Sequence, residues 1–201
     1  NSNAINGRQG TDILTGLAGD DYYQFVDGWG YDTVVEAAGE GIDTITFYAY
    51  TGDTVYSTIT PVLNDLAFWL DDSHLINQVF DMEAPGNQVD FTFNEVEYIY
   101  GGAGIDELHG LNENSRYDLD GRTFDSDPLF VLENAMLQLA ASETNTYTGL
   151  IVGTTLEFMN IEKLFAGMAD DRFNILEDQV FELHGGAGND TYYVDSPTDI
   201  V

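Results

Sequence analysis

The feature that most constrains this chain is a short repeat in which glycines precede an aspartate and a large apolar residue. Two copies follow each other without a gap, at residues 7–15 (GRQGTDILT) and 16–24 (GLAGDDYYQ). The core Gly-x-Asp-x-apolar returns at residues 30–34 and 41–45, which puts four aspartates in one phase: Asp12, Asp21, Asp32 and Asp43. A tandem repeat of this kind predicts stacked units that pack against their neighbours.

The same template returns far along the chain. Residues 101–109 (GGAGIDELH) and 185–193 (GGAGNDTYY) match it closely, and residues 166–173 (AGMADDRF) form a degenerate copy. A strand-like stretch also recurs, as residues 91–97 (FTFNEVE) and 156–162 (LEFMNIE), each leading into a glycine turn. The repeats therefore continue beyond the N-terminal copies.

The chemistry of the motif is that of a cation site. Glycine permits tight turns and close backbone approach, which bring carbonyl groups and the following Asp carboxylate to one point. The apolar residue two positions after the Asp should project into the core. One turn offers too few oxygens for the 6 to 8 ligands of calcium, so a second turn about two repeats along must complete the site. This arithmetic pairs turn 7–12 with 27–32, turn 16–21 with 38–43, and turn 166–171 with 185–190.

The pattern Gly-Gly-x-Gly-x-Asp-x-apolar-x resembles the RTX, or haemolysin-type, calcium-binding repeats of large secreted bacterial surface proteins and adhesins. The resemblance implies a β-roll in which backbone carbonyls of the glycine turns and the Asp carboxylates bind several Ca²⁺ ions. Carried over residue by residue, the implied carboxylate ligands are Asp12, Asp21, Asp32, Asp43, Asp106, Asp171, Asp190 and Asp199. The implied backbone ligands belong to Gly7, Gly10, Gly16, Gly19, Gly28, Gly30, Gly39, Gly41, Gly101, Gly102, Gly104, Gly185, Gly186 and Gly188.

The charge of the chain fits such a role. Hydrophobic residues make up 43% of the chain, which is enough to fold, yet 36 acidic against 5 basic residues give a formal charge of −31. Divalent cations would relieve that repulsion, whereas nucleic acid is excluded because a basic patch is missing. Cysteine is absent and no apolar run is long enough to span a membrane, as in many exported bacterial proteins. We also expect the chain to be part of a longer polypeptide.

We therefore predict a mainly β fold, a right-handed parallel β-roll or β-helix solenoid with strand-rich inserts. The expected divisions are calcium-binding turns over 1–47, an insert over 48–100, a turn at 101–109, an insert over 110–160 and further turns over 161–201. Strands are expected at 54–59, 90–93 and 149–152, and a short helix at 129–139.

The same sequence features allow other interpretations. Gly-Asp turns also occur in hairpins that bind nothing. His74, His109 and His184 could ligate zinc but have no evident convergent partners. The acid pairs at 20–21, 71–72 and 170–171 could imitate a glycosidase pair, although neighbours on a strand point to opposite faces. The tyrosines, Trp29 and Trp69 could stack on sugars or could simply pack.

The function expected from these features is mechanical, with no enzymatic activity. Calcium would fold and stiffen a secreted chain into a rigid spacer, adhesin or filament segment outside the cell. One alternative is a calcium-dependent glycan-binding or accessory module of a secreted carbohydrate-active enzyme. Another is a filament subunit that assembles with copies of itself. The expected partners are calcium and neighbouring repeats, with surface glycans as a further option.

Overall fold

A computed structural model describes most of the chain as β-strands and connecting turns. The described residues are 2–26, 28–37, 41–51, 58–71, 75–92, 95–96, 98–112, 116–120, 148–152, 157–159, 161–176 and 182–194. These residues form strands and no helix, so the prediction of a mainly β fold is confirmed. They accordingly contain no helix that could cross a membrane.

The strands form two large sheets and one hairpin. The nine-stranded sheet has the order β1 (Ala4–Ile5), β3 (Tyr22–Gln24), β5 (Thr44–Thr46), β11 (Tyr98–Tyr100), β15 (Glu157–Met159), β14 (Thr148–Val152), β13 (Arg116–Asp120), β17 (Arg172–Leu176) and β19 (Thr191–Val194). The eight-stranded sheet has the order β18 (Glu182–His184), β16 (Lys163–Phe165), β12 (Glu107–His109), β8 (Leu66–Trp69), β9 (Ile76–Asp81), β10 (Gln88–Thr92), β4 (Tyr31–Val34) and β2 (Ile13–Leu14). The hairpin joins β6 (Tyr48–Thr51) to β7 (Thr58–Pro61).

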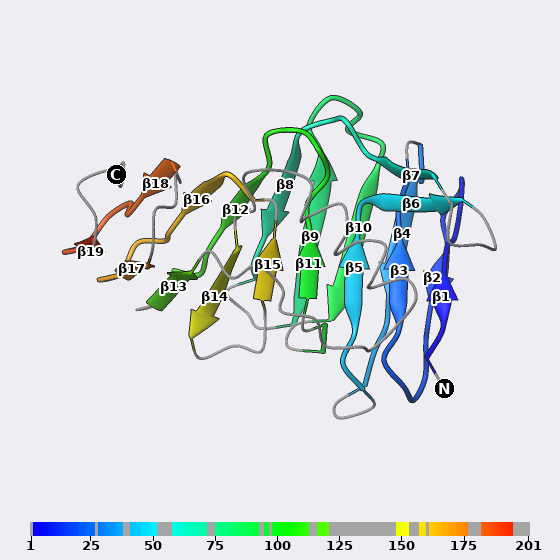
Figure 1. The fold of residues 1–201 in the computed structure, drawn as a ribbon, viewed down its shortest axis with the longest axis horizontal. Coiled ribbons are helices and arrows are strands. Elements are labelled where there is room, and N and C mark those ends of the chain that lie inside the picture. The colour runs from blue at the N-terminus through cyan, green and yellow to red at the C-terminus, as the bar shows by residue number, and fades with distance from the viewer. Residues whose placement is uncertain are drawn as a thin grey trace.

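The chain passes back and forth between the two sheets as it advances along the molecule (Figure 1). From β1 to β5 each strand lies in the sheet opposite to that of the strand before it. Strands that are hydrogen-bonded neighbours within one large sheet are mostly parallel, as in the pairs β1 with β3, β3 with β5 and β2 with β4. The motif turns therefore lie at the two edges where the chain changes sheet.

The expectation of a purely parallel arrangement is wrong in the inserts, because β9 and β14 are antiparallel to their neighbours. The reversal before β9 is built by an aspartate, since Asp71 Oδ2 accepts hydrogen bonds from the N–H groups of Leu75 (3.0 Å) and Ile76 (3.1 Å). The reversal after β9 is built likewise by Asp81 Oδ1, which accepts from the N–H of Ala84 at 2.8 Å. Such side-chain turns fold the chain back within its own sheet.

The expected elements within the inserts have mixed outcomes. The strand expected at 149–152 lies within β14, and residues 90–92 of the next expected strand lie within β10. Residues 58–59 of the third belong to β7. Residues 54–57, residue 93 and the helix expected at 129–139 lie outside the described residues.

The core lies between the sheets and is built from the middle residues of the short strands. In the nine-stranded sheet Tyr23, Ile45 and Ile99 are in register and fully buried. Opposite them, Phe68 and Leu108 are in register in the eight-stranded sheet and equally buried. Burial of each such side chain contributes about 1.5–3 kcal/mol. Tyr23, Ile45 and Leu108 each come two residues after a motif aspartate, so the predicted inward position of the apolar residue is confirmed.

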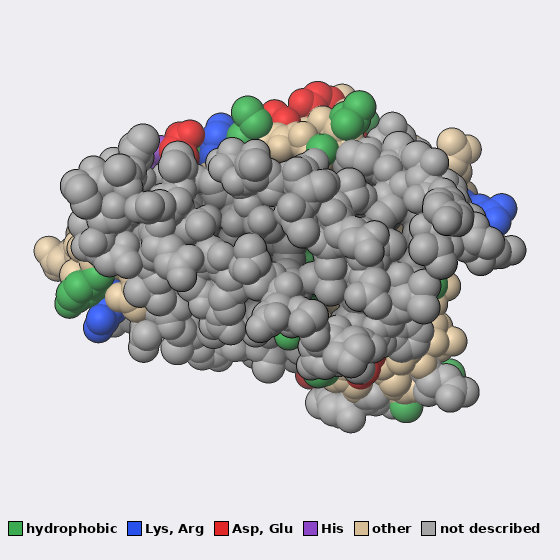
Figure 2. All heavy atoms as spheres, viewed as in Figure 1, with side chains coloured by type: hydrophobic (Ala, Val, Ile, Leu, Met, Phe, Trp, Pro, Cys, Tyr) green, Lys and Arg blue, Asp and Glu red, His purple; other side chains and the backbone are tan. Residues whose placement is uncertain are grey.

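The visible surface carries acidic side chains beside hydrophobic ones along the upper rim in Figure 2, with isolated Lys or Arg side chains between them. Among the coloured, described residues of that view there is no continuous basic face. The described side chains on this side therefore do not form a basic surface that would offset the net negative charge of the sequence.

Candidate calcium sites

The motif turns divide between two edges of the molecule. We call the first edge the turns that lead from the nine-stranded to the eight-stranded sheet, and the second edge the turns that lead back. Turns 7–12, 27–32 and 101–106 lie on the first edge, and turns 16–21, 41–43, 166–171 and 185–190 lie on the second. The four N-terminal motif aspartates, Asp12, Asp21, Asp32 and Asp43, therefore alternate between edges, which is why a turn there meets its partner two repeats along.

All three predicted pairs of turns are stacked against each other. The N–H of Asp12 donates to Asp32 Oδ1 at 2.9 Å, and the N–H of Asp21 donates to Asp43 Oδ1 at 2.9 Å. The third pair repeats the contact between the N–H of Asp171 and Asp190 Oδ1, at 3.0 Å. In each pair the carboxylate of the later coil accepts from the backbone of the earlier one. The aspartates thus form ladders along both edges.

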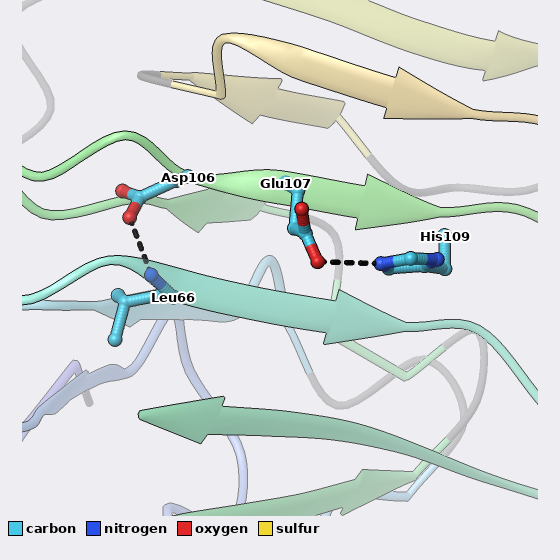
Figure 3. A network of polar contacts seen from close by, with 4 residues as sticks. All are labelled: Leu66, Asp106, Glu107 and His109. Carbon is cyan, nitrogen blue, oxygen red and sulfur yellow. Dashed lines mark hydrogen bonds and ion pairs between the residues drawn. The ribbon is translucent and has the colours of Figure 1, made fainter. Parts of the chain in front are cut away.

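Asp106 also accepts a backbone hydrogen bond from the preceding coil, although that coil carries no motif aspartate at this position. Its Oδ1 accepts a hydrogen bond from the N–H of Leu66 at 2.8 Å, from the neighbouring strand, while Glu107 and His109 lie further along its own strand (Figure 3). The N–H of Asp106 in turn donates to Glu162 Oε2 at 2.7 Å. A glutamate outside the motif therefore continues the ladder of the first edge.

The second oxygen of the motif carboxylates has a different environment. Within the described part of the chain, Oδ2 of Asp21, Asp32 and Asp106 is buried and has no hydrogen-bond partner. Burial raises the pKa of Asp32, and it raises that of Asp106 well above the usual value, even though backbone hydrogen bonds lower both. Buried polar atoms are normally hydrogen-bonded, and an oxygen left without a partner is costly. A hard cation is the partner that carboxylate oxygens of this kind fit.

The first glycine of each turn makes room for these oxygens. A Cβ at Gly7 would lie 3.1 Å from Asp12 Oδ2 and 3.3 Å from Asp32 Oδ2, so the two carboxylates approach the same point. At Gly16 and Gly185 a Cβ would collide with the carboxylate of the aspartate five residues later, Asp21 and Asp190 respectively. Glycine is thus required at this position because the aspartate carboxylate occupies the space of a Cβ. The carboxylate oxygens that meet there would fit a cation held between coils.

The later glycines of the motif allow the coils to stack. A Cβ at Gly30, Gly41, Gly104 or Gly188 would collide with a backbone carbonyl of the preceding coil. Positive φ angles add a second requirement at Gly10, Gly19, Gly28, Gly30, Gly186 and Gly188. Gly101 and Gly102 lie buried in turn 101–106. Gly39 and Asp199 fall outside the described residues.

The two acid pairs that the structure describes in full, 20–21 and 170–171, do not converge as a catalytic pair would. Asp21 is fully buried, whereas Oδ1 of its neighbour Asp20 accepts from the N–H of Ile42 in the next turn, at 2.9 Å. Asp170 makes the same contact with the N–H of Asn189 at 2.7 Å. The first member of each pair therefore joins two turns from outside, and the second faces the interior. Asp72, from the remaining pair, is not among the described residues.

Sequence reasoning missed Glu36 and Glu162. One carboxylate oxygen from each of Asp21, Glu36 and Asp43 lies within 4.8 Å of those from the other two, and all three residues are buried. Glu36 stands outside the Gly-x-Asp phase, so the motif gives no signal for it. Glu162 had a signal, since the recurrent stretches 91–97 and 156–162 both end in glutamate ahead of a glycine turn.

His109 and His184 lie apart from these ladders. Nε2 of His109 contacts Glu107 Oε1 at 2.9 Å, and Nε2 of His184 contacts Glu182 Oε1 at 2.8 Å, each within one strand. The single group of three potential metal ligands among the described residues contains no histidine. His74 lies outside those residues.

Comparison with known proteins identifies the motif. The model of the RTX calcium-binding nonapeptide repeat matches the chain in 4 copies, over residues 1–24, 92–114 and 182–200. Comparison with curated proteins and with solved structures gives no match. The chain therefore carries RTX repeats, and the matched residues include Asp12, Asp21, Asp106 and Asp190.

Proposed function

We propose that this segment, which carries RTX calcium-binding nonapeptide repeats, is a calcium-dependent structural module of a secreted bacterial protein and is not an enzyme. In this proposal the coils form one continuous right-handed β-roll, interrupted by in-sheet hairpins. Calcium folds and stiffens it outside the cell, where it serves as a spacer, adhesin or filament segment.

The observation that carries the proposal is that the two oxygens of the Asp21, Asp32 and Asp106 carboxylates have different environments. One oxygen accepts a backbone N–H of the adjacent coil, as in the contact of Asp32 Oδ1 with the N–H of Asp12. The other oxygen is buried and, in Asp21, Asp32 and Asp106, has no hydrogen-bond partner among the described residues. An arrangement that only joined coils would have no reason to bury the second oxygen.

The buried carboxylates have an energetic cost that a bound cation would offset. Buried carboxylates repel each other and lose hydration, a cost of several kcal/mol per ion unless an opposite charge compensates. Bound calcium would supply that charge between the coils. The chain's own residues would hold it: Asp12 with Asp32 and Asp171 with Asp190 would supply oxygens, and the turn glycines let the coils lie close enough to share them.

Because calcium binding is coupled to folding, the calcium concentration would decide whether the module is folded. In a cytosol with little calcium, a net charge of −31 opposes compaction, so the chain would stay loose enough for export. At the millimolar calcium of an extracellular medium, binding to the folded state alone stabilises that state by mass action.

The outer face of the eight-stranded sheet bears on the glycan-binding alternative. Trp69, His109, Phe165 and His184 form one row of rings, with neighbouring centroids 3.8, 4.8 and 4.3 Å apart and nearly parallel planes. Sugars stack on exposed ring faces, but both faces of His109 and Phe165 are covered by neighbouring rings. The row therefore favours a packing role for these aromatics.

The test compares the purified segment in chelator and in millimolar calcium. Circular dichroism should show β signal appearing with calcium, and calorimetry should show uptake of several ions. A chain that is equally folded and equally stable in chelator would refute the proposal. Sedimentation with calcium tests assembly into filaments, and glycan binding at saturating calcium tests the alternative function.

A matched pair of variants locates the effect at the ladder. Asp32→Asn keeps an oxygen for the N–H of Asp12 but replaces the buried second oxygen with an amide. We expect this variant to be at least as stable as the parent in chelator and clearly less stabilised by calcium. Glu182→Gln removes the same charge from an exposed position and should leave the calcium response unchanged.

A further inference from the structure

Three buried carboxylates meet at the N-terminal end of the second edge. Asp21 ends turn 16–21, Glu36 follows β4, and Asp43 precedes β5. Their exposed fractions are 0%, 5% and 2%, and one oxygen from each lies within 4.8 Å of the others. The stacked turns thus contain a third acid that the nonapeptide does not specify.

Glu36 is held in place by two donors from different elements. Its Oε1 accepts from the N–H of Gly16 at 3.0 Å and from the hydroxyl of Tyr23, a fully buried side chain. Gly16 is also the residue against which Asp21 Oδ2 is folded. Asp21, from the same turn, and Glu36, from the next coil, therefore both lie against Gly16.

A second observation points to a ligand at this place. Asp21 is completely buried, and its Oδ2 has no hydrogen-bond partner among the described residues, whereas its Oδ1 accepts from the N–H of Asn3 at 2.6 Å. Asp43 Oδ1 is likewise used by the N–H of Asp21. One carboxylate oxygen of each aspartate is thus committed to the ladder, and Asp21 keeps the other inside the cluster without a donor.

We infer that Glu36 converts the stacked turns 16–21 and 41–43 into a three-carboxylate calcium site, which binds more tightly than the two-aspartate turns and fills first. The inference rests on the proposed function, that the motif turns bind calcium. The described residues contain no other group of three acidic or histidine ligands this close together. Calcium affinity rises with the number of charged ligands and with the rigidity of the site.

The same residues assign Tyr23 as a positioning residue. Its hydroxyl bonds to Glu36, so the phenol ring lies close to the ion that Glu36 would bind. A terbium ion in place of calcium should therefore emit when tyrosine is excited. The hydroxyl of Tyr192 lies beside Gly185 at the turns of Asp171 and Asp190, so the emission specific to the Glu36 site is the part that Tyr23→Phe removes.

The experiment compares the parent chain with Glu36→Gln and with Glu182→Gln, which removes an equal charge from an exposed strand position. Glu36→Gln should weaken the first calcium-binding step in calorimetry by roughly tenfold or more and should remove the part of the terbium emission that depends on Tyr23. Glu182→Gln should change neither. Tyr23→Phe should weaken the first step by a smaller factor, because it removes only one of the two hydrogen bonds that hold Glu36.

The possible failures are distinguishable. If the parent chain takes up no calcium, the proposed function itself fails. If it binds calcium but Glu36→Gln leaves the first step unchanged, the inference about Glu36 is overturned while the proposed function stands. If Glu36→Gln does not fold at any calcium concentration, Glu36→Asp decides: this charge-retaining variant should recover calcium-dependent folding, and failure to recover it overturns the inference.

Discussion

Substitution of Gly104 by alanine measures how closely the turns of neighbouring coils are stacked. Gly104 lies in turn 101–106 beneath residues 64–65 of the preceding coil, and its φ is not in the left-handed region. A Cβ there would lie 2.8 Å from the amide nitrogen of Asp65 and closer still to the carbonyl oxygen of Asn64. Because both atoms belong to the backbone, the coils must separate to admit one methyl group.

The magnitude follows from the bonds between these two turns. The N–H of Ala103 donates to Val62 O (2.8 Å), that of Ile105 to Asp65 Oδ1 (2.7 Å), and that of Leu66 to Asp106 Oδ1 (2.8 Å). Each hydrogen bond contributes about 0.5–1.5 kcal/mol net, and overpacking alone costs about 1–3 kcal/mol. We therefore expect Gly104→Ala to lower the free energy of unfolding by about 2–4 kcal/mol. At about 2–4 °C per kcal/mol, the melting temperature should fall by roughly 5–15 °C.

Gly86 supplies the matched control, because a Cβ at this position meets nothing within 4 Å. Gly86→Ala removes backbone freedom from the unfolded chain and should be neutral or stabilising by up to about 1 kcal/mol. Thermal unfolding of both variants at saturating calcium gives the comparison. Equal melting temperatures for the two would mean that the turns are not in contact, and the stacked-coil interpretation of the glycines would be wrong.

Three further predictions test other parts of the structure. Leu17 has a φ of 70° and is exposed, so Leu17→Gly should stabilise by about 1 kcal/mol in thermal unfolding, whereas Leu17→Ala, which keeps the Cβ, should not. Phe68→Ala should cost about 3–5 kcal/mol in denaturant unfolding, and Trp69→Ala, from the outer face of the same strand, clearly less; the reverse order would place the core on the wrong face. Burial raises the pKa of Asp106 well above 3.8, so in chelator the folded state should gain stability as the pH falls toward 4, and Asp106→Asn should remove that gain. At a fixed subsaturating calcium concentration, acid should instead weaken the calcium response, because protons compete for the carboxylates; melting curves across pH check both signs.

The sequence predicts those parts of the site that the repeat itself determines, which are the spacing of the aspartates, the pairing of the turns and the buried apolar residue. Asp12 and Asp32 share a phase with the turn glycines, and a chain that alternates between two sheets necessarily brings every second turn to the same edge. The pairing of turns 7–12 with 27–32 and of 166–171 with 185–190 follows from that alternation alone. The buried position of Leu108 follows from the two-residue period of a strand after Asp106.

The remaining parts depend on contacts between coils that the repeat does not encode. Glu36 accepts from the N–H of Gly16 across 20 positions of sequence, a contact that no local pattern reveals. Glu162 meets Asp106 across 56 positions of sequence. Asp71 and Asp81 accept backbone hydrogen bonds at the turns before and after the antiparallel strand β9. In the sequence, such aspartates cannot be told apart from aspartates that only lie on the solvated surface.

The acidity of this chain has two separate structural uses, and they should respond differently to calcium. An inner row, exemplified by Asp21 and Asp106, keeps an oxygen buried without a hydrogen-bond donor among the described residues, and the proposed function assigns this oxygen to calcium. An outer row consists of Asp20, Asp65 and Asp170, whose Oδ1 atoms accept N–H groups of the next turn at 2.9, 2.7 and 2.7 Å. The outer row already has its donors in backbone amides, so calcium has little to add there. Calcium dependence should therefore concentrate in the inner row, and the net charge alone overstates how many carboxylates an ion must neutralise before the coils can stack.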